Sequence, residues 1–142
     1  MAHLTARVKA LSQHANVEPF KIHPLDYQSF EIGQCEYLVL TDKEADKQAI
    51  AYIEDSLWAF NAKFLAAHAG IDELVFTAIH NNNRCEDNNS VIRKLVGSRA
   101  SFLRLARDAI GCDGRGHFLN PYDSREDQET VGDVTYYIYR TN

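Results

Sequence analysis

Cysteine is scarce in this 142-residue sequence, which holds three: Cys35, Cys85 and Cys112. An odd number at wide spacing is not a disulfide framework, so the small disulfide-stapled scaffolds are excluded. The sequence also lacks a run of about 18 apolar residues, which argues against a membrane-spanning helix. Residues 1–15 are too polar for a secretory signal and are typical of an amphipathic helix. We therefore expect a cytoplasmic protein with reduced thiols and no membrane contact.

A surplus of basic residues is absent as well. Lys and Arg number 15 against 20 Asp and Glu, which gives a net charge of −5. A general phosphate-binding surface needs clustered Lys and Arg, so nucleic acid is an open but not a favoured partner. The acidic residues are spread along the chain and are too few for a DNA mimic, which would need dense rows of carboxylates.

The sequence does have the material for one hydrophobic core. Hydrophobic residues make up 45% and aromatic residues 11%, close to the average of globular proteins and unlike disordered chains. A length of 142 residues fits a domain of ordinary size, so we assign residues 1–142 to a single domain. Nothing in the sequence indicates an oligomeric state.

Local patterns predict three elements in the first forty residues. Apolar residues at spacings of four and three predict a short amphipathic helix over residues 4–14. Residues 16–34 contain turn-forming Pro and Gly and predict a long irregular connection that lies on the core, with room for one short extended piece. Residues 35–40 are rich in strand-forming side chains and predict a strand.

A capping box marks the next element. Thr41 precedes Glu44 by three positions, so a hydroxyl and a carboxylate can each satisfy a free amide at a helix start. We predict a helix from residue 42 that ends at 68–70, with Asn61 as a candidate interruption. One apolar stripe is expected to face the core. Its members are Ala49, Ile53, Leu57, Phe60 and Phe64.

Three further helices are predicted over residues 73–80, 85–96 and 99–110, the first of them capped by Asp72. The first is expected to turn inward Leu74, Val75, Ala78 and Ile79. The last is expected to bury Phe102, Leu103, Ala106 and Ile110.

The final thirty residues change character. We predict a short strand at 116–119, a turn at 120–123, an acidic mobile segment at 123–133 and a strand at 134–140. With the strand at 35–40, these form a small antiparallel sheet of about three strands. The expected fold class is α+β, with a helical layer of four to five helices beside that sheet.

Two stretches resemble a family of small uncharacterised proteins from bacteriophages and other mobile elements. They are the C-terminal pattern DGRGHFL, YD and YYIYRTN within residues 113–142, and SLWAFN at 56–61. The resemblance covers about the C-terminal two thirds of the chain and implies a context, a phage-borne protein in a bacterial host cytoplasm, rather than a chemistry. The turn departs from the family pattern, because Asn120-Pro121 and Ser124-Arg125 stand where relatives carry small residues and glycine.

One group of polar residues near the C-terminus has the composition of a catalytic site. A histidine can move a proton near neutrality, a carboxylate can orient it, and an arginine can hold a phosphate. The group consists of Arg115, His117, Tyr122, Asp123 and Glu126. No spacing defines its geometry, and a structured turn with a local ion pair accounts for the same residues.

Metal and thiol chemistry are weakly supported. His80, Cys85, Cys112 and His117 offer four nitrogen and sulfur donors, but without the short Cys-x2-Cys knuckle of zinc sites. Buried cysteines and surface histidines explain them better. Cys112 with His117 is a poor candidate for nucleophilic catalysis, because proximity in sequence does not make a catalytic pair. We predict no metal and no cofactor.

Two further groups are candidates for binding. Trp58, with Phe60, Phe64 and Tyr52 nearby, would form a protein-binding hot spot if exposed, although Phe60 and Phe64 are expected in the core. The most basic stretch could contact phosphates if its side chains share a face, or could be a solvated surface. It comprises Arg93, Lys94, Arg99, Arg104 and Arg107.

The sequence therefore favours a binding protein over an enzyme. Under this hypothesis the chain engages a host or phage protein, and antagonism of a host defence, as by an anti-CRISPR protein, is its sharpest form. The expected contact residues are Trp58, Arg115, His117, Tyr122, Asp123 and Tyr139. The alternative is a small hydrolase or nucleotide-binding protein that uses Arg115, His117 and Asp123.

Overall fold

A computed structural model describes residues 2–142, with side chains from Thr5 onward. The chain divides into two compact units. Unit 1 runs to Ala49 and resumes from Asp113 to Asn142, and unit 2 comprises Ile50–Cys112. This division does not test whether the chain behaves as one domain, so the single-domain assignment stays a prediction.

The fold is α+β, as predicted, but with more elements of both kinds. Within residues 2–142 there are seven α-helices and one antiparallel sheet of five strands, instead of four to five helices and about three strands. The strands follow the order β1-β2-β3-β5-β4. Their bounds are β1 His23–Pro24, β2 Ser29–Ile32, β3 Cys35–Leu40, β4 Asp127–Val131 and β5 Val134–Arg140. The strands predicted at 35–40 and 134–140 are confirmed.

Three predictions around this sheet were wrong. The irregular connection at 16–34 contains two strands, β1 and β2, and a 3-10 turn at Pro19–Lys21. The segment 123–133, predicted to be mobile, contributes β4, which pairs along its length with β5. The predicted strand at 116–119 is instead the one-turn helix α7, Arg115–Leu119. A strand would send neighbouring side chains to opposite faces, whereas the helical turn buries both Phe118 and Leu119.

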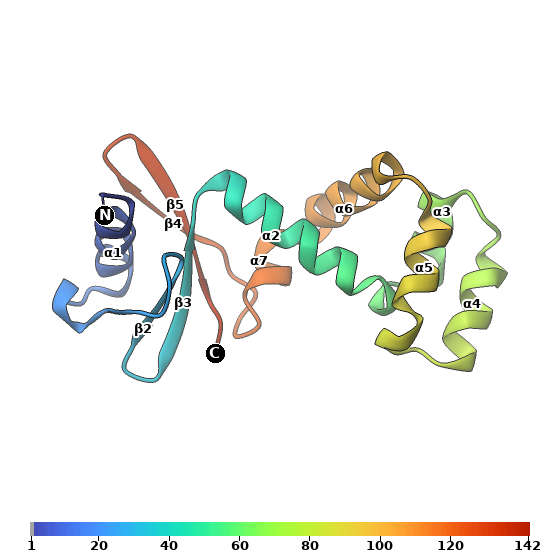
Figure 1. Cartoon of the computed structure of the whole chain (residues 1–142), viewed down its shortest axis with the longest axis horizontal. Helices are drawn as coiled ribbons and strands as arrows, with labels where there is room; N and C mark the ends of the chain where they lie inside the picture. Colours follow the sequence, from blue (N-terminus) through green and yellow to red (C-terminus); the bar gives the residue numbers. More distant parts are fainter. Residues whose placement is uncertain (1) are drawn as a thin grey trace. The chain divides into compact units, whose positions relative to one another are not determined.

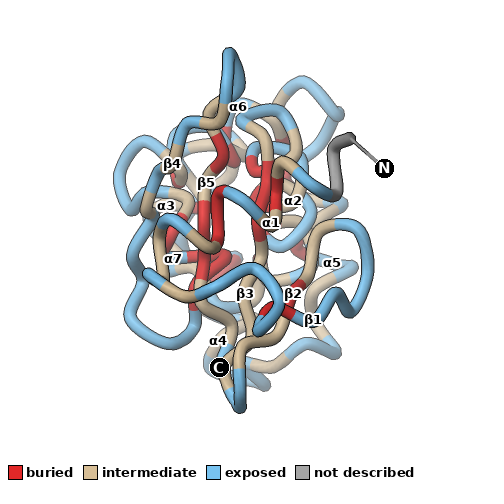
Figure 2. Tube along the Cα trace, turned by 90° about the vertical axis from the view of Figure 1, so that its left-hand side faces the viewer, coloured by how far each residue is buried: buried red, intermediate tan, exposed pale blue. Residues whose placement is uncertain are grey.

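The helix α1, Ala2–Ala15, covers one face of the sheet and confirms the helix predicted at 4–14 (Figure 1). Its residues Ala10 and Leu11 are fully buried against strand side chains. The strand residues of this cluster are Phe30, Val39, Tyr136 and Ile138. Figure 2 shows the buried stretches of α1 and β5 in red. Leu40 and Tyr139 alternate to the opposite face, where α7 contacts β5.

The capping box is confirmed at the start of α2, Asp42–Asp55. The amide of Thr41 donates to Glu44 Oε1 at 2.9 Å, and the amide of Glu44 donates to Thr41 Oγ1 at 3.3 Å. This reciprocal pair satisfies two amides that the helix itself leaves without partners.

The predicted helix does not continue to residue 68. A 3-10 turn, Leu57–Ala59, follows α2, and Asn61 caps the new helix α3, Ala62–Ala69, by accepting from the Phe64 amide at 2.8 Å. Because the 3-10 turn separates α2 from α3, the apolar stripe predicted for one continuous helix does not keep to one face. Ala49, Ile53 and Leu57 are buried as expected, but Phe60 and Phe64 are only half-buried and Leu65 occupies the interior.

Unit 2 contains three more helices, α4 Glu73–Asn82, α5 Asn89–Val96 and α6 Arg99–Asp113, the last ending just beyond its border. A 3-10 turn, Glu86–Asn88, replaces the first part of the helix predicted at 85–96. Phe102 and Ala106 are buried as predicted, while Leu105 and Ala109 take the places expected for Leu103 and Ile110.

The inward face of α4 was predicted wrongly. Asp72 caps the helix as expected, accepting from the Leu74 amide at 2.9 Å. Leu74 is nevertheless 72% exposed and Val75 39% exposed, whereas Phe76 is fully buried. Apolar residues at five of six successive positions leave the facing direction undefined, so contacts with neighbouring helices decide it.

Candidate functional site

Arg115, at the start of α7, is the centre of an ion-pair cluster in unit 1. Its Nε donates to Glu126 Oε1 at 2.8 Å, and its Nη1 lies 2.8 Å from Asp42 Oδ1 and 3.0 Å from Asp46 Oδ1. The guanidinium carbon lies 4.5 Å from the ring centroid of Tyr137. The side chain is only 10% exposed. Carboxylates of the same chain thus occupy the arginine that was a candidate for holding a phosphate.

Tyr139 belongs to the same cluster. It is fully buried, and its hydroxyl donates to Glu126 Oε1. Burial raises the pKa of Tyr139, and the hydrogen bond to Glu126 raises it further. Burial alone would lower the pKa of Arg115, but its bonds to Glu126 and Asp42 raise it overall. These ion pairs and hydrogen bonds, with the contact between Arg115 and the Tyr137 ring, join α7, α2 and β5.

His117 and Asp123 do not join the ion-pair cluster of Arg115, and each of them contacts different residues. His117 is exposed on α7, with its ring edge-on to Phe118 at a centroid distance of 4.9 Å. Asp123 Oδ1 accepts from Asn120 Nδ2 at 2.7 Å and from the Arg125 amide at 3.1 Å. The described structure records no contact among the three residues of the catalytic alternative, which stays a prediction.

The turn that follows α7 is organised by Asn120, a residue that the sequence analysis treated only as part of a turn. Asn120 is 2% exposed, and its Nδ2 donates to Asp123 Oδ1 and, at 2.9 Å, to the carbonyl of Arg125. Its Oδ1 accepts from the amides of Tyr122 and Asp123, both at 3.0 Å. A buried amide with four satisfied hydrogen bonds holds this loop in one conformation.

Beside this turn lies a small polar pocket of about 180 Å³ within unit 1. It brings together two predicted binding residues, Tyr122 and Asp123, with residues from α1, β3, β4 and β5. We call it the polar pocket. It is lined by His14, Tyr37, Asn120, Tyr122, Asp123, Arg125, Asp127, Ile138 and Arg140. The sequence offered no signal for this grouping, because the lining residues are spread from position 14 to position 140.

The charges of the polar pocket are nearly balanced. Arg125 Nη2 lies 3.2 Å from Asp127 Oδ1, and His14 Nε2 lies 3.9 Å from Asp127 Oδ2. The guanidinium carbon of Arg140 lies 3.5 Å from the ring centroid of Tyr122. Its Nε donates to the carbonyl of Asn142 at 2.7 Å. No described residue accepts from Nη1 or Nη2 of Arg140, so that edge of the guanidinium is available to a ligand.

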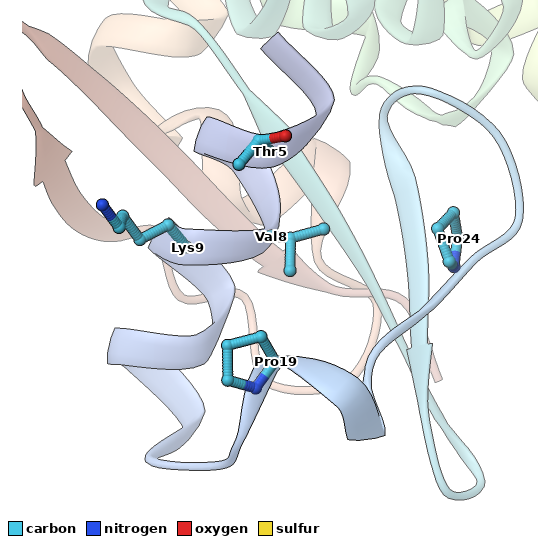
Figure 3. A pocket seen from close by; sticks show the side chains of 5 residues that line it. All are labelled: Thr5, Val8, Lys9, Pro19 and Pro24. Atoms are coloured by element: carbon cyan, nitrogen blue, oxygen red, sulfur yellow. The ribbon is translucent and has the colours of Figure 1, made fainter. Parts of the chain in front are cut away.

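A second hollow lies between α1 and the first turns of unit 1 and is largely apolar. It encloses about 280 Å³ and is lined by Thr5, Val8, Lys9, Pro19 and Pro24. Figure 3 shows these side chains coming from α1, from the 3-10 turn and from β1. We call it the apolar groove. Among the described residues that line it, Lys9 is the one with a charge.

The segments that form the apolar groove also carry large apolar side chains in contact with solvent. Phe20, next to Pro19, is 76% exposed, and Leu25, next to Pro24, is 52% exposed. Tyr27 is 62% exposed and lies 5.5 Å from the Arg7 guanidinium. Burying such side chains against a partner would be favourable by about 25 cal/mol per Å² of apolar surface. Residues 16–34 were expected to lie on the core. Ile22 and Phe30 do so, whereas Phe20, Leu25 and Tyr27 are exposed.

The aromatic residues proposed from sequence in unit 2 do not form one exposed cluster. Trp58 is half-buried, and its amide donates to Asn89 Oδ1 at 3.1 Å. Phe60 and Phe64 stack on each other with centroids 5.4 Å apart, and Tyr52 is 53% exposed.

The basic stretch of α5 and α6 is partly neutralised within unit 2. Glu54 accepts from Arg93 Nε at 2.8 Å and lies 3.1 Å from Arg99 Nη1. Hydrogen bonding to Arg93 lowers the pKa of Glu54 against the opposing effect of burial. Both guanidinium groups lie over the Phe102 ring. Arg104 donates to the neutral Ser101 Oγ at 3.2 Å, so Lys94, Arg104 and Arg107 all remain exposed charges.

No group of three or more His, Cys, Asp or Glu side chains among the described residues is placed to hold a metal ion. His80 and Cys85 lie in unit 2 and His117 lies in unit 1, while Cys112 is exposed and places its Sγ 3.9 Å from Asp108 Oδ1. Burial lowers the pKa of His80, whose Nε2 is buried without a hydrogen-bond partner.

Across residues 2–142, none of the helices combines the length and the apolar character needed to cross a membrane. No protein-family model, no curated protein and no solved structure matches this chain.

Proposed function

We propose that this chain is a binding protein that engages a protein partner through the apolar groove and the exposed side chain of Phe20. The observation that carries the proposal is that Phe20, the most exposed large apolar residue of the described chain, directly follows Pro19, which lines a hollow of about 280 Å³. Exposed apolar patches with a polar border are typical of protein-binding surfaces. The catalytic alternative lacks a comparable observation, because Arg115 is already paired with three carboxylates of the same chain.

The partner docks by inserting side chains rather than by adding a strand to the sheet. The strand at this edge, β1, has two residues, and one of them is Pro24, which has no amide hydrogen to offer. Short edge strands that contain proline resist pairing with another chain. The apolar groove beside β1 has room for one or two apolar side chains instead.

The positive charge of Lys9 in the groove adds a second requirement for the partner segment. Lys9 lines it, so a partner segment that carries an apolar side chain next to a carboxylate matches both of its features. The buried apolar contact supplies affinity, and the carboxylate near Lys9 supplies orientation.

The biological setting of the proposal comes from the sequence resemblance to phage and mobile-element proteins. In that setting the partner is a protein of the host or of the phage, in the bacterial cytoplasm, and antagonism of a host defence is the most specific form of the proposal. The predicted contact residues Trp58 and His117 are outside the groove, so the proposal does not depend on them.

The proposal is tested with a photo-reactive p-benzoylphenylalanine in place of Phe20, and in a matched protein in place of Leu74. Both positions are highly exposed, 76% and 72%, but they lie in different units. We expect one bacterial protein to be cross-linked through position 20 and not through position 74. The cross-linked protein, once purified, should bind Phe20→Glu at least about tenfold more weakly than the original chain, because a hot-spot side chain is lost.

Leu74→Glu serves as the control, since it adds the same charge to an equally exposed site. The proposal is rejected if the captured protein binds Phe20→Glu as tightly as the unchanged chain, or if Leu74→Glu loses as much affinity. Cross-linking at neither position also rejects it. His117→Ala should leave binding unchanged, whereas loss of function in that variant alone would favour the catalytic alternative.

A further inference from the structure

We propose that the polar pocket binds a small α-amino acid, with the ligand carboxylate on Arg140 and its ammonium group at Asp123. The pocket shares α1 with the apolar groove but none of the groove's lining residues, so this activity is separate from protein binding. The inference starts from the hydrogen-bonding capacity that the pocket leaves unused.

Arg140 presents the unused donors. Its ring stacking on Tyr122 and its Nε bond to the Asn142 carbonyl fix the plane of the guanidinium. Nη1 and Nη2 then form one free edge, and two parallel N–H groups on such an edge match the two oxygens of a carboxylate. The neighbouring cation, Arg125, is already paired with Asp127, whereas the described hydrogen bond of Arg140 uses only its Nε, towards the main-chain oxygen of Asn142.

Asp123 presents an unused acceptor. Its Oδ1 is held by Asn120 and by the Arg125 amide, which leaves Oδ2 without a described partner. Asn120 is 2% exposed and fixes this carboxylate before any ligand arrives. Asp123 and Arg140 line the same pocket, so together they suit a ligand that carries both charges.

The two carboxylates of the pocket discriminate against simple anions. Asp123 and Asp127 together offset the charges of Arg125 and Arg140, so the pocket has no net positive charge that would attract phosphate. An amino acid has no net charge and satisfies both signs. Tyr37 also lines the pocket, and burial raises the pKa of its hydroxyl, which therefore stays protonated as a donor.

The volume restricts the size of the ligand. A hollow of about 180 Å³ suits a small ligand such as alanine or serine. The lining is mainly polar, with Ile138 as its aliphatic member, which favours serine over alanine.

The test is calorimetric titration of the full chain with L-serine, with acetate, ethylamine and inorganic phosphate as separate probes. We expect saturable binding of serine at millimolar concentration, and binding about tenfold or more weaker for acetate and ethylamine, because each makes only one of the two charged contacts. Arg140→Gln and Asp123→Asn should each weaken serine binding by about tenfold or more. Asp123→Asn keeps the Oδ1 acceptor that Asn120 needs, so the turn is preserved.

Matched controls separate this inference from the proposed function. Phe20→Glu should bind serine like the original chain, and Arg140→Gln should keep the affinity for the cross-linked protein partner. Amide NMR shifts of Tyr122 and Ile138 in the unchanged chain provide a measurement that needs no variant. The inference is overturned if serine binding does not saturate, if phosphate binds more tightly than serine, or if the serine-induced shifts lie away from the pocket.

Discussion

Arg7 on α1 and Glu44 on α2 form a two-point ion pair, with Arg7 Nη1 2.8 Å from Glu44 Oε1 and Arg7 Nη2 3.0 Å from Oε2. Arg7 is 4% exposed, and its Nη1 also donates to the Val39 carbonyl at 2.6 Å. The carboxylate that completes the capping box with Thr41 therefore also neutralises a buried arginine on another helix. One side chain joins α1, β3 and α2.

This pair predicts a specific acid sensitivity. Burial acts to raise the pKa of Glu44, but hydrogen bonds from Arg7 and the Thr41 amide lower it from 4.5 to about 2. A folded-state pKa below the unfolded value means that the stabilisation is complete above pH 4.5 and is lost as the pH falls towards 2. Glu44→Gln should lower the free energy of unfolding by about 2 kcal/mol at pH 7, since it leaves the buried Arg7 charge unpaired.

Urea unfolding of this variant and of the original chain, at several pH values between 7 and about 2, measures the effect. The difference in the free energy of unfolding between the two proteins should shrink as the pH falls from 4.5 towards 2. Glu18→Gln, at an exposed site without a described side-chain partner, is the control. It should leave the free energy of unfolding unchanged at every pH tested. If Glu44→Gln lowered the free energy of unfolding by the same amount at both ends of this pH range, the ion-pair account would be contradicted.

A second prediction concerns the close approach of the loop after α7 to the helix itself. A Cβ at Gly116 would lie 2.3 Å from the Ser124 carbonyl oxygen and 2.8 Å from the Arg125 carbonyl carbon. Both are backbone atoms and cannot rotate away, so Gly116→Ala should destabilise the chain by about 2 kcal/mol. Gly111→Ala is the matched control, because a Cβ there meets open space in α6 and should stabilise by about 0.5 kcal/mol.

Thermal unfolding of the two alanine variants in parallel decides this prediction. Equal midpoints for Gly116→Ala and the original chain would show that the loop does not lie against α7 as described.

A third prediction concerns Asn120. Asn120→Ala removes four hydrogen bonds and leaves the amides of Tyr122 and Asp123 without their acceptor. Because unsatisfied buried groups are costly, we expect a loss of about 2–3 kcal/mol in the free energy of unfolding. Hydrogen exchange should show faster exchange of those two amides. Asn81→Ala, on the exposed surface of α4, should change neither quantity.

A fourth prediction addresses the start of α4. Asp72→Ala removes the acceptor for the Leu74 amide and should cost about 1 kcal/mol. Asp72→Asn keeps an oxygen at the same position, so it should cost only a few tenths of a kcal/mol. Chemical denaturation of both variants provides the comparison, and indistinguishable losses would mean that charge rather than capping stabilises the helix start.

The elements that the sequence determined by itself are those whose signals are local. The capping box at Thr41 and Glu44, the cap at Asp72 and the strand-forming runs at 35–40 and 134–140 depend on neighbours within a few residues, and the structure confirms each of them. Their stability comes from hydrogen bonds and backbone preferences that a short segment already contains.

Tertiary structure alone decided the elements and contacts that depend on distant partners. The acidic β4 forms a strand because β5 supplies its hydrogen bonds, and Arg115 is occupied because folding brings Asp42 and Asp46 beside it. The polar pocket gathers residues from His14 to Arg140, and α4 buries Phe76 while Leu74 faces solvent. Composition and periodicity carry no information about which remote segment lies opposite, so only packing in three dimensions could place these side chains.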